Sequence, residues 1–176
     1  MKVWLRNVML TLSLGLLLSC SASLEDYQDT TPAFDLFGFF EGQSTAWGML
    51  QDRSGKQTRR FEVALVGTVT ADTLVLAEDF VFDDGETQQR TWTIVRQADG
   101  SYRGTAPDVI GQAVGRVAGN ALHWQYTLRI PVGDTSYDIT LNDWMYRQDS
   151  HRLFNLARLS KFGVEVGRIT LFFEKP

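Results

Sequence analysis

The sequence predicts an all-β fold, a single antiparallel up-and-down barrel of about ten strands. Turn signals recur at nearly regular intervals after Gly42, and each separates runs rich in Val, Thr, Leu, Phe, Trp and Tyr. Asp84-Gly85 and Asp99-Gly100 are two-residue loops of the kind that joins hairpin strands. Residues 122–130 alternate between apolar and polar side chains, so we expect a strand with one buried and one solvent-exposed face.

The runs between the turn signals are the expected strands, in chain order. They cover residues 43–51, 57–69, 73–83, 87–98, 101–107, 111–118, 121–131, 135–147, 152–161 and 164–174. Such strands hide their edges either by closing into a barrel or by splitting into a sandwich. The short connections favour the barrel, because sandwiches need longer connections between sheets. We therefore expect a lipocalin-like or fatty-acid-binding-protein-like barrel, which is wide enough for a small ligand.

The first 19 residues are typical of a signal peptide. Lys2 and Arg6 make the start positive, and the apolar run that follows is too short to span a bilayer. This run ends in Leu17-Leu18-Ser19-Cys20, which resembles the lipobox of bacterial lipoproteins. We expect cleavage before Cys20 and lipidation of its thiol and amine, which would anchor the chain stably. The alternative is that Cys20 is a plain apolar residue of a signal or membrane anchor.

Lipidation predicts a location on a membrane of the bacterial cell envelope. Ser21 follows the cysteine where an Asp tends to mean inner-membrane retention, which favours the periplasmic face of the outer membrane. Residues 20–33 are polar and acidic without a hydrophobic period, and we expect a flexible tether there. Residues 34–176 are the expected barrel domain, and its first apolar segment, Phe34–Phe40, is expected to cap the barrel.

Composition narrows the function classes. Removal of 19 of the 176 residues leaves 157, enough for one domain, with 15 basic and 21 acidic side chains. This negative balance argues against nucleic acid as a partner. The sequence has no nucleophile elbow, no phosphate-binding glycine loop and no Cys or His cluster, so it predicts no catalytic set, no cofactor and no metal. We expect a monomer.

Charged residues interrupt the apolar faces of three expected strands. Glu78 shares a face with leucines and phenylalanines, Arg90 flanks Trp92, and Arg158 shares a face with Phe154. If these faces point inward, the carboxylate and the guanidinium groups must pair with each other or bind a ligand. The alternatives are a structural Glu–Arg pair, or a bulge that turns the charges towards water.

The expected strand 137–147 changes phase at Asn142-Asp143. A bulge there would place Asp143, Tyr146 and Arg147 at the rim of the barrel. A tyrosine and an arginine suit the carboxylate headgroup of a ligand. The candidate ligand-binding residues are Glu78, Arg90, Trp92, Tyr146, Arg147 and Arg158.

Several motifs are spread over nearly the whole mature chain. They are Asp79-Phe80-Val81-Phe82-Asp83-Asp84-Gly85-Glu86-Thr87-Gln88 with Arg90 and Trp92, then Asp143-Trp144-Met145-Tyr146, then Ser160-Lys161-Phe162-Gly163 and Val166-Gly167. This set is similar to that of uncharacterised proteobacterial lipoproteins grouped as domain of unknown function 3833. The resemblance implies a lipoprotein with no settled activity.

The sequence favours a non-catalytic, membrane-tethered barrel that binds an apolar or fatty-acyl ligand. One alternative is a lipid-modifying enzyme that uses Glu78 or Asp143 with Arg158. Another is a structural or assembly lipoprotein, which predicts a filled core and an exposed apolar patch. A hollow interior would favour ligand binding over the structural role.

Overall fold

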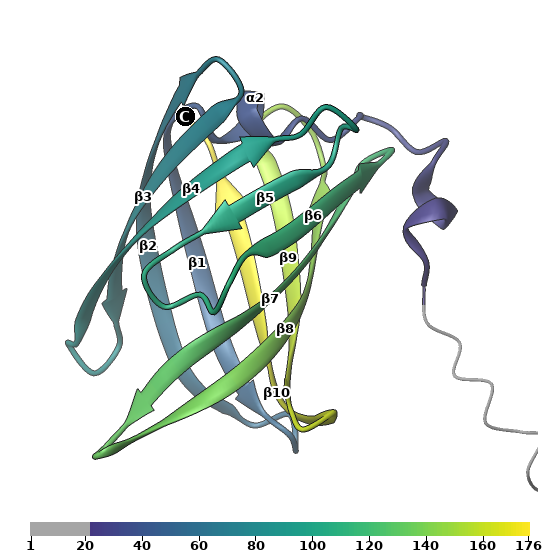
Figure 1. Ribbon diagram of the computed structural model, residues 1–176. Helices are drawn as coiled ribbons and strands as arrows, with labels where there is room; N and C mark the ends of the chain where they lie inside the picture. Colours follow the sequence, from purple (N-terminus) through teal and green to yellow (C-terminus); the bar gives the residue numbers. More distant parts are fainter. Residues whose placement is uncertain (1–21) are drawn as a thin grey trace, which may run out of the picture.

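Ten antiparallel strands pair with their sequence neighbours and close on themselves in the computed structural model, which describes residues 22–176 (Figure 1). The strands are β1 (Gly42–Asp52), β2 (Gln57–Thr70), β3 (Thr73–Phe82), β4 (Thr87–Arg96), β5 (Tyr102–Thr105), β6 (Ala113–Ala118), β7 (Ala121–Val132), β8 (Thr135–Arg147), β9 (Arg152–Lys161) and β10 (Val164–Glu174). Pairing of β1 with β10 closes the ring. The predicted all-β up-and-down barrel is therefore confirmed.

Local chemistry explains why the chain turns where it does. Gly85 and Gly100 have φ angles of 87° and 80°, the left-handed conformation that tight hairpin turns require and that glycine adopts without a steric penalty. Between the turns, side chains alternate between the lumen and the outer wall. In β9, for example, Leu153 and Leu159 are buried while Phe154 and Leu156 are exposed.

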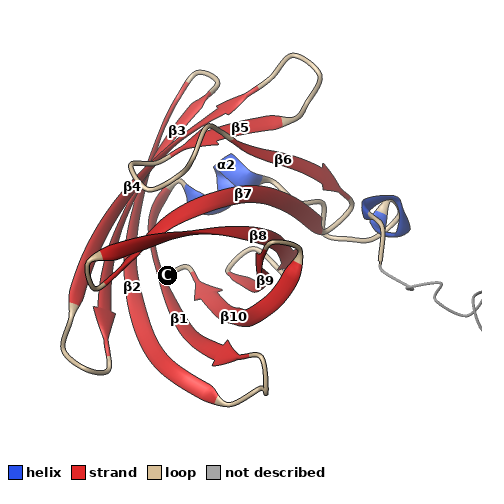
Figure 2. Cartoon of the chain, turned by 60° about the horizontal axis from the view of Figure 1, so that its bottom comes forward, coloured by secondary structure: helices blue, strands red, loops and turns tan. Residues whose placement is uncertain are grey.

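Helix α2 (Leu36–Phe40) closes one end of the barrel and lies within the ring of strands (Figure 2). Asp35 caps it by accepting a hydrogen bond from the Gly38 amide at 3.1 Å. Every residue of the helix except Gly38 is buried in the core. Close packing also explains Gly67, because a Cβ there would collide with the Phe40 carbonyl. The expected cap over Phe34–Phe40 is thus present as a short helix.

Residues assigned by sequence to the flexible tether contact the barrel. The 3-10 helix η2 (Leu24–Tyr27) packs on β6 and β7. Thr30 accepts a hydrogen bond from the Asn120 amide at 2.9 Å, and the Arg147 guanidinium donates one to the Ala33 carbonyl at 2.9 Å. From Leu24 onwards the chain is therefore docked, because aromatic and polar side chains of the outer wall hold it. Cys20 and the signal segment lie outside the described residues.

Strand β8 keeps one phase along its length, so the expected bulge at Asn142-Asp143 is wrong. Its register is continuous through both residues against β7 and against β9. Asp143 consequently continues the inward face and is buried, whereas Trp144 and Tyr146 lie on the outer face. The apparent change of phase arose because a polar residue occupies the lumen and aromatic residues occupy the wall.

Candidate functional site

A cavity of about 620 Å³ lies inside the barrel. Leu36 and Phe40 of helix α2 form its closed end, and its wall is mainly apolar. The apolar lining includes Phe61, Leu76, Phe80, Trp92, Ile94, Leu122, Trp124, Leu128, Leu141, Ala157, Ile169 and Leu171. The interior is therefore hollow, with a small set of polar groups among apolar ones.

The cavity reaches the barrel wall where β5 and β6 are short. Only Thr93–Arg96 of β4 pair with β5, and only residues 121–125 of β7 pair with β6. Further along β7, the connection between β5 and β6 contacts the strand directly: the backbone amide of Arg129 donates a hydrogen bond to the Asp108 carbonyl at 2.8 Å. Glu86, Gln88 and Pro131 line the cavity beside this thin part of the wall. Backbone hydrogen bonds thus join the connection to β7, whereas the Arg90–Asp108 side-chain contact joins it to β4 in place of strand pairing.

Glu78, Arg90 and Asp108 form a buried charged group in this region. Arg90 donates from Nε and Nη2 to the Asp108 carboxylate, at 3.1 Å and 2.7 Å. Glu78 lies opposite Arg90 in the β3–β4 register, with its Oε2 atom 3.7 Å from Arg90 Nη1. Burial raises the pKa of Glu78 to about 7, although the Arg90 charge acts to lower it.

Asp143 is the centre of a second polar group in the lumen. Its carboxylate accepts hydrogen bonds from the Tyr126 hydroxyl, at 3.1 Å, and from the Asn155 amide. The Asn155 amide also donates to the Trp144 carbonyl at 3.1 Å. Burial raises the pKa of Asp143 to about 6, and the hydrogen bonds from Asn155 and Tyr126 oppose that rise.

The structure places three of the six sequence-predicted ligand-binding residues at the cavity. Glu78, Arg90 and Trp92 line it. Arg158 instead lies on the exposed face of β9, so the expectation that its face points inward is wrong. Phe154 and Leu156 share that outer face, which is why the outer face reads as apolar in the sequence.

Tyr146 and Arg147 are also absent from the cavity lining among the described residues. Tyr146 is half-buried on the outer wall, and its ring centroid lies 5.5 Å from that of Tyr27. Arg147 holds the N-terminal segment through the Ala33 carbonyl. Sequence reasoning missed Asp108, which lies in a connection without periodicity, and Asn155, which stands on the face taken to be external. Tyr126 was recognisable only as a member of the alternating face of residues 122–130.

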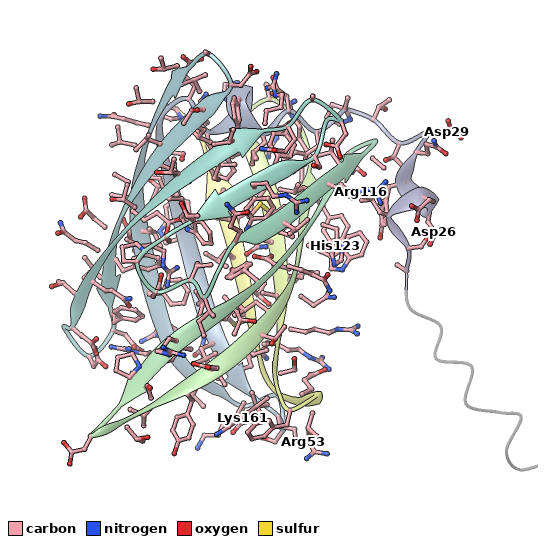
Figure 3. The ribbon with its side chains drawn as sticks, viewed as in Figure 1. Asp26, Asp29, Arg53, Arg116, His123 and Lys161 are labelled. Atoms are coloured by element: carbon pink, nitrogen blue, oxygen red, sulfur yellow. The ribbon has the colours of Figure 1, made fainter. Side chains whose placement is uncertain are left out.

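The outer wall carries a row of aromatic side chains, here called the aromatic belt, made of Trp47, Phe172, Phe154 and Tyr146. These residues stand directly opposite one another across β1, β10, β9 and β8. Trp47 and Phe154 are 44% and 42% exposed. Trp144, in the next row, stacks on His123, and Figure 3 shows His123 on the side of the barrel that faces the N-terminal segment. The outer wall therefore has an apolar surface as well as a hollow interior.

The chain matches a family model described as "Protein of unknown function (DUF3833)" over residues 14–175. The chain belongs to this family. No similar protein was found among curated ones. Since the description of DUF3833 assigns no activity, the function has to be inferred from the geometry of the barrel. None of the helices within residues 22–176 has the length and apolar character needed to cross a membrane.

Proposed function

We propose that this DUF3833 protein binds an apolar ligand with an acyl chain inside its barrel, while lipidated Cys20 tethers it to the periplasmic face of the outer membrane. The observation that supports binding is the cavity of about 620 Å³, closed at one end by α2. Ligand sites are typically about 300–1,000 Å³, mostly apolar, with a few converging polar groups. This barrel has all three properties.

The hollow interior favours ligand binding over a purely structural role. A structural lipoprotein needs only a filled core, because an empty apolar space forfeits packing contacts and lowers stability. Residues 34–40 close the lumen without filling it. A ligand bound in the lumen would supply the packing contacts that the empty cavity lacks.

The proposal is tested by lipid extraction from the full chain purified from bacterial membranes. We expect a co-purifying molecule with an acyl chain, identified by mass spectrometry. Ala157→Phe, which adds a ring to the cavity lining, is expected to reduce the bound lipid several-fold. Ala64→Phe is the matched control, because Ala64 is exposed on the outer wall of β2.

Thermal unfolding establishes that both variants are folded before the lipid is measured. Wild-type protein that carries no lipid and takes up none from added vesicles would contradict the proposal. Equal lipid content in the Ala157→Phe and Ala64→Phe variants would contradict the assignment of the binding site to the lumen.

A second candidate, a lipid-modifying enzyme, is favoured by the two buried carboxyls. The pKa of Glu78 is about 7 and that of Asp143 about 6, both in the range useful for general acid–base catalysis near neutral pH. Arg158, the third residue of that hypothesis, is on the outer wall and has no part in it. Turnover of a bound acyl ester that is lost in Glu78→Gln or Asp143→Asn would support this candidate, and recovery of the ester unchanged would reject it.

A further inference from the structure

The polar end of the cavity has an excess of acidic groups. Three carboxyls, those of Glu78, Asp108 and Asp143, line the lumen around the guanidinium of Arg90. Arg59, Glu86 and Arg129 also line the cavity; Arg59 Nη2 pairs with Asp84 and Glu86, Arg129 pairs with Asp138, and the buried Arg59 Nε has no partner within residues 22–176. The other nearby polar groups, Tyr126 and Asn155, are neutral. An additional negative charge placed among these groups would meet like charges in a medium of low dielectric constant, where repulsion is strong.

Arg90, the arginine beside Glu78, is already engaged. Arg90 Nε donates to Asp108 Oδ1 and Nη2 donates to Asp108 Oδ2, the bidentate arrangement in which guanidinium binds carboxylate most strongly. Its remaining Nη1 faces Glu78. A ligand carboxylate would have to replace one of these two internal carboxylates, so Arg90 is poorly suited to bind a free fatty acid.

Glu78 has unused capacity to accept a hydrogen bond. Its Oε2 atom is buried and has no hydrogen-bond partner within residues 22–176, and the 3.7 Å contact with Arg90 is too long to be a hydrogen bond. A buried polar atom without a partner is costly, and one that lines a cavity can be satisfied by a ligand. The group that satisfies a carboxylate oxygen is an O–H or N–H donor.

We infer, resting on the proposed ligand-binding function, that the cavity selects acyl or alkyl chains whose polar end donates hydrogen bonds through a hydroxyl or amino group, with Glu78 as the acceptor. A free fatty-acid carboxylate is discriminated against at Glu78, Arg90 and Asp108. The chain occupies the apolar region between α2 and the charged group. This ligand class differs from the carboxylate headgroup expected from Tyr146 and Arg147, which do not line the cavity.

A competition experiment with chain-matched ligands tests the inference. The full chain, held in a fixed concentration of non-ionic detergent, is mixed at pH 8 with equal amounts of hexadecanoate, hexadecan-1-ol and hexadecylamine. It is then re-isolated, and the bound ligands are extracted and quantified by mass spectrometry. We expect the amine and the alcohol each to be retained about tenfold more than the carboxylate.

Two further arms assign the effect to Glu78. Glu78→Gln is expected to reduce amine retention about tenfold, whereas Glu62→Gln, the same change at an exposed position of β2, leaves it unaltered. Retention of the amine by the wild type is expected to be higher at pH 8 than at pH 5.5, because Glu78 and Asp143, whose pKa values are about 7 and about 6, both ionise in this range. The part of this rise that is lost in Glu78→Gln is the part due to Glu78.

The outcomes separate this inference from the proposed function. Retention of hexadecanoate equal to or above that of the amine overturns the selectivity while leaving ligand binding intact. Unchanged amine retention in Glu78→Gln overturns the role of Glu78. Retention of none of the three ligands by a folded wild-type protein contradicts the proposed function itself.

A separate observation, the aromatic belt, points to the wall that faces the membrane. Tyr27 packs beside the belt, with ring centroids 5.7 Å from Trp144 and 5.5 Å from Tyr146. Only six residues lie between Cys20 and Tyr27, and the seven-residue step between them spans at most about 25 Å when extended. Tryptophan and tyrosine are the side chains most enriched where protein meets lipid headgroups.

We propose, on the basis of lipidation at Cys20, that the aromatic belt rests in the headgroup region of the membrane that holds the anchor. The belt crosses β1, β10, β9 and β8, whereas the thin wall of the cavity lies between β4 and β7. By strand order these are nearly opposite sides of the barrel. The thin wall then faces the aqueous phase, and ligand exchange takes place on that side.

Fluorescence quenching by brominated phosphatidylcholine vesicles tests this orientation on the full acylated chain. We expect Trp47→Phe to remove a large part of the quenching, whereas Trp124→Phe, a matched change inside the barrel, removes little. Equal quenching in the two variants of a membrane-bound protein overturns the orientation and favours a protein partner for the belt. An unmodified Cys20 found by mass spectrometry contradicts the anchor instead.

Discussion

Arg90 on β4 and Asp108 in the β5–β6 connection are joined by a bidentate ion pair, with Nη2 and Oδ2 2.7 Å apart. The connection in turn hydrogen-bonds to β7. The pair therefore ties two parts of the wall where no strand pairing joins them. The same ion pair therefore stabilises the wall and sets part of the charge that lines the cavity.

Asp108→Asn should weaken the fold and alter ligand selection. Removal of one partner from a largely buried ion pair leaves Arg90 underpaired, and we expect a loss of about 1–3 kcal/mol in the free energy of unfolding. Hexadecanoate retention should rise, because the guanidinium becomes available. Asp138→Asn, which breaks an exposed pair with Arg129, is the control and should cost less than about 1 kcal/mol. Equal losses in urea unfolding would contradict the role of the buried pair.

Stability should fall as pH rises from about 4 to about 7. The pKa of Glu78 is raised from 4.5 to about 7 and that of Asp143 from 3.8 to about 6, so the folded state binds more protons than the unfolded state in this window. Ionisation therefore favours unfolding as pH increases, and the cost is complete above the folded pKa values. Urea unfolding at a series of pH values measures the slope.

Glu78→Gln should flatten the upper part of this profile. The variant removes the charge that burial disfavours, so at pH 8 it should be more stable than the wild type, by an amount on the order of 1–3 kcal/mol. Near pH 4 the two proteins should be similar. Glu62→Gln, at an exposed position, should follow the wild-type profile. A Glu78→Gln variant that is less stable at pH 8 would show that the ionised carboxylate contributes favourably through Arg90.

Tyr27→Ala should release the N-terminal segment while leaving the barrel folded. The Tyr27 ring is the aromatic contact of η2 with Trp144 and Tyr146. We expect faster amide hydrogen exchange over residues 24–33 and a change below about 1 kcal/mol in barrel stability. Tyr137→Ala, at an exposed aromatic on β8, is the control and should leave exchange in residues 24–33 unchanged.

Gly67→Ala should displace the cap. A Cβ at Gly67 collides with the backbone carbonyl of Phe40, which cannot move without shifting α2. We expect a loss of about 1–3 kcal/mol in stability, typical of overpacking, and faster loss of bound ligand. Thr68→Ala, the exposed neighbour, should change neither property. Unaltered stability in Gly67→Ala would mean that the cap adjusts freely.

Cys20→Ser should move the protein from the membrane fraction to the soluble fraction without unfolding the barrel. The reason is that a serine hydroxyl cannot receive the thioether-linked diacylglyceryl group. Cell fractionation measures the location, and circular dichroism measures the fold. Ser23→Ala, three residues along the chain, is the control. A Cys20→Ser protein that stays in the membrane fraction would contradict anchoring through the thiol.

The local sequence pattern was sufficient to predict the barrel and part of the candidate site. Period-two alternation and glycine turns depend on near neighbours in the chain, so the strands and the all-β class were predictable. Glu78 and Arg90 were recognisable because each interrupts an apolar face. Arg158 was misplaced because Phe154 and Leu156 make the outer face of β9 as apolar as its inner face, and alternation does not say which face is inside.

The sequence by itself determined the strand order, the cap and the presence of charges among apolar faces, since these follow from propensity and spacing. Only the tertiary structure decided which charges meet. Asp108 reaches Arg90 because β5 and β6 are short, and Asp143 meets Asn155 because the β8–β9 register brings them together in the lumen. These contacts join residues 18 and 12 positions apart in the chain, on different strands or connections, and the pairing of neighbouring strands determines them.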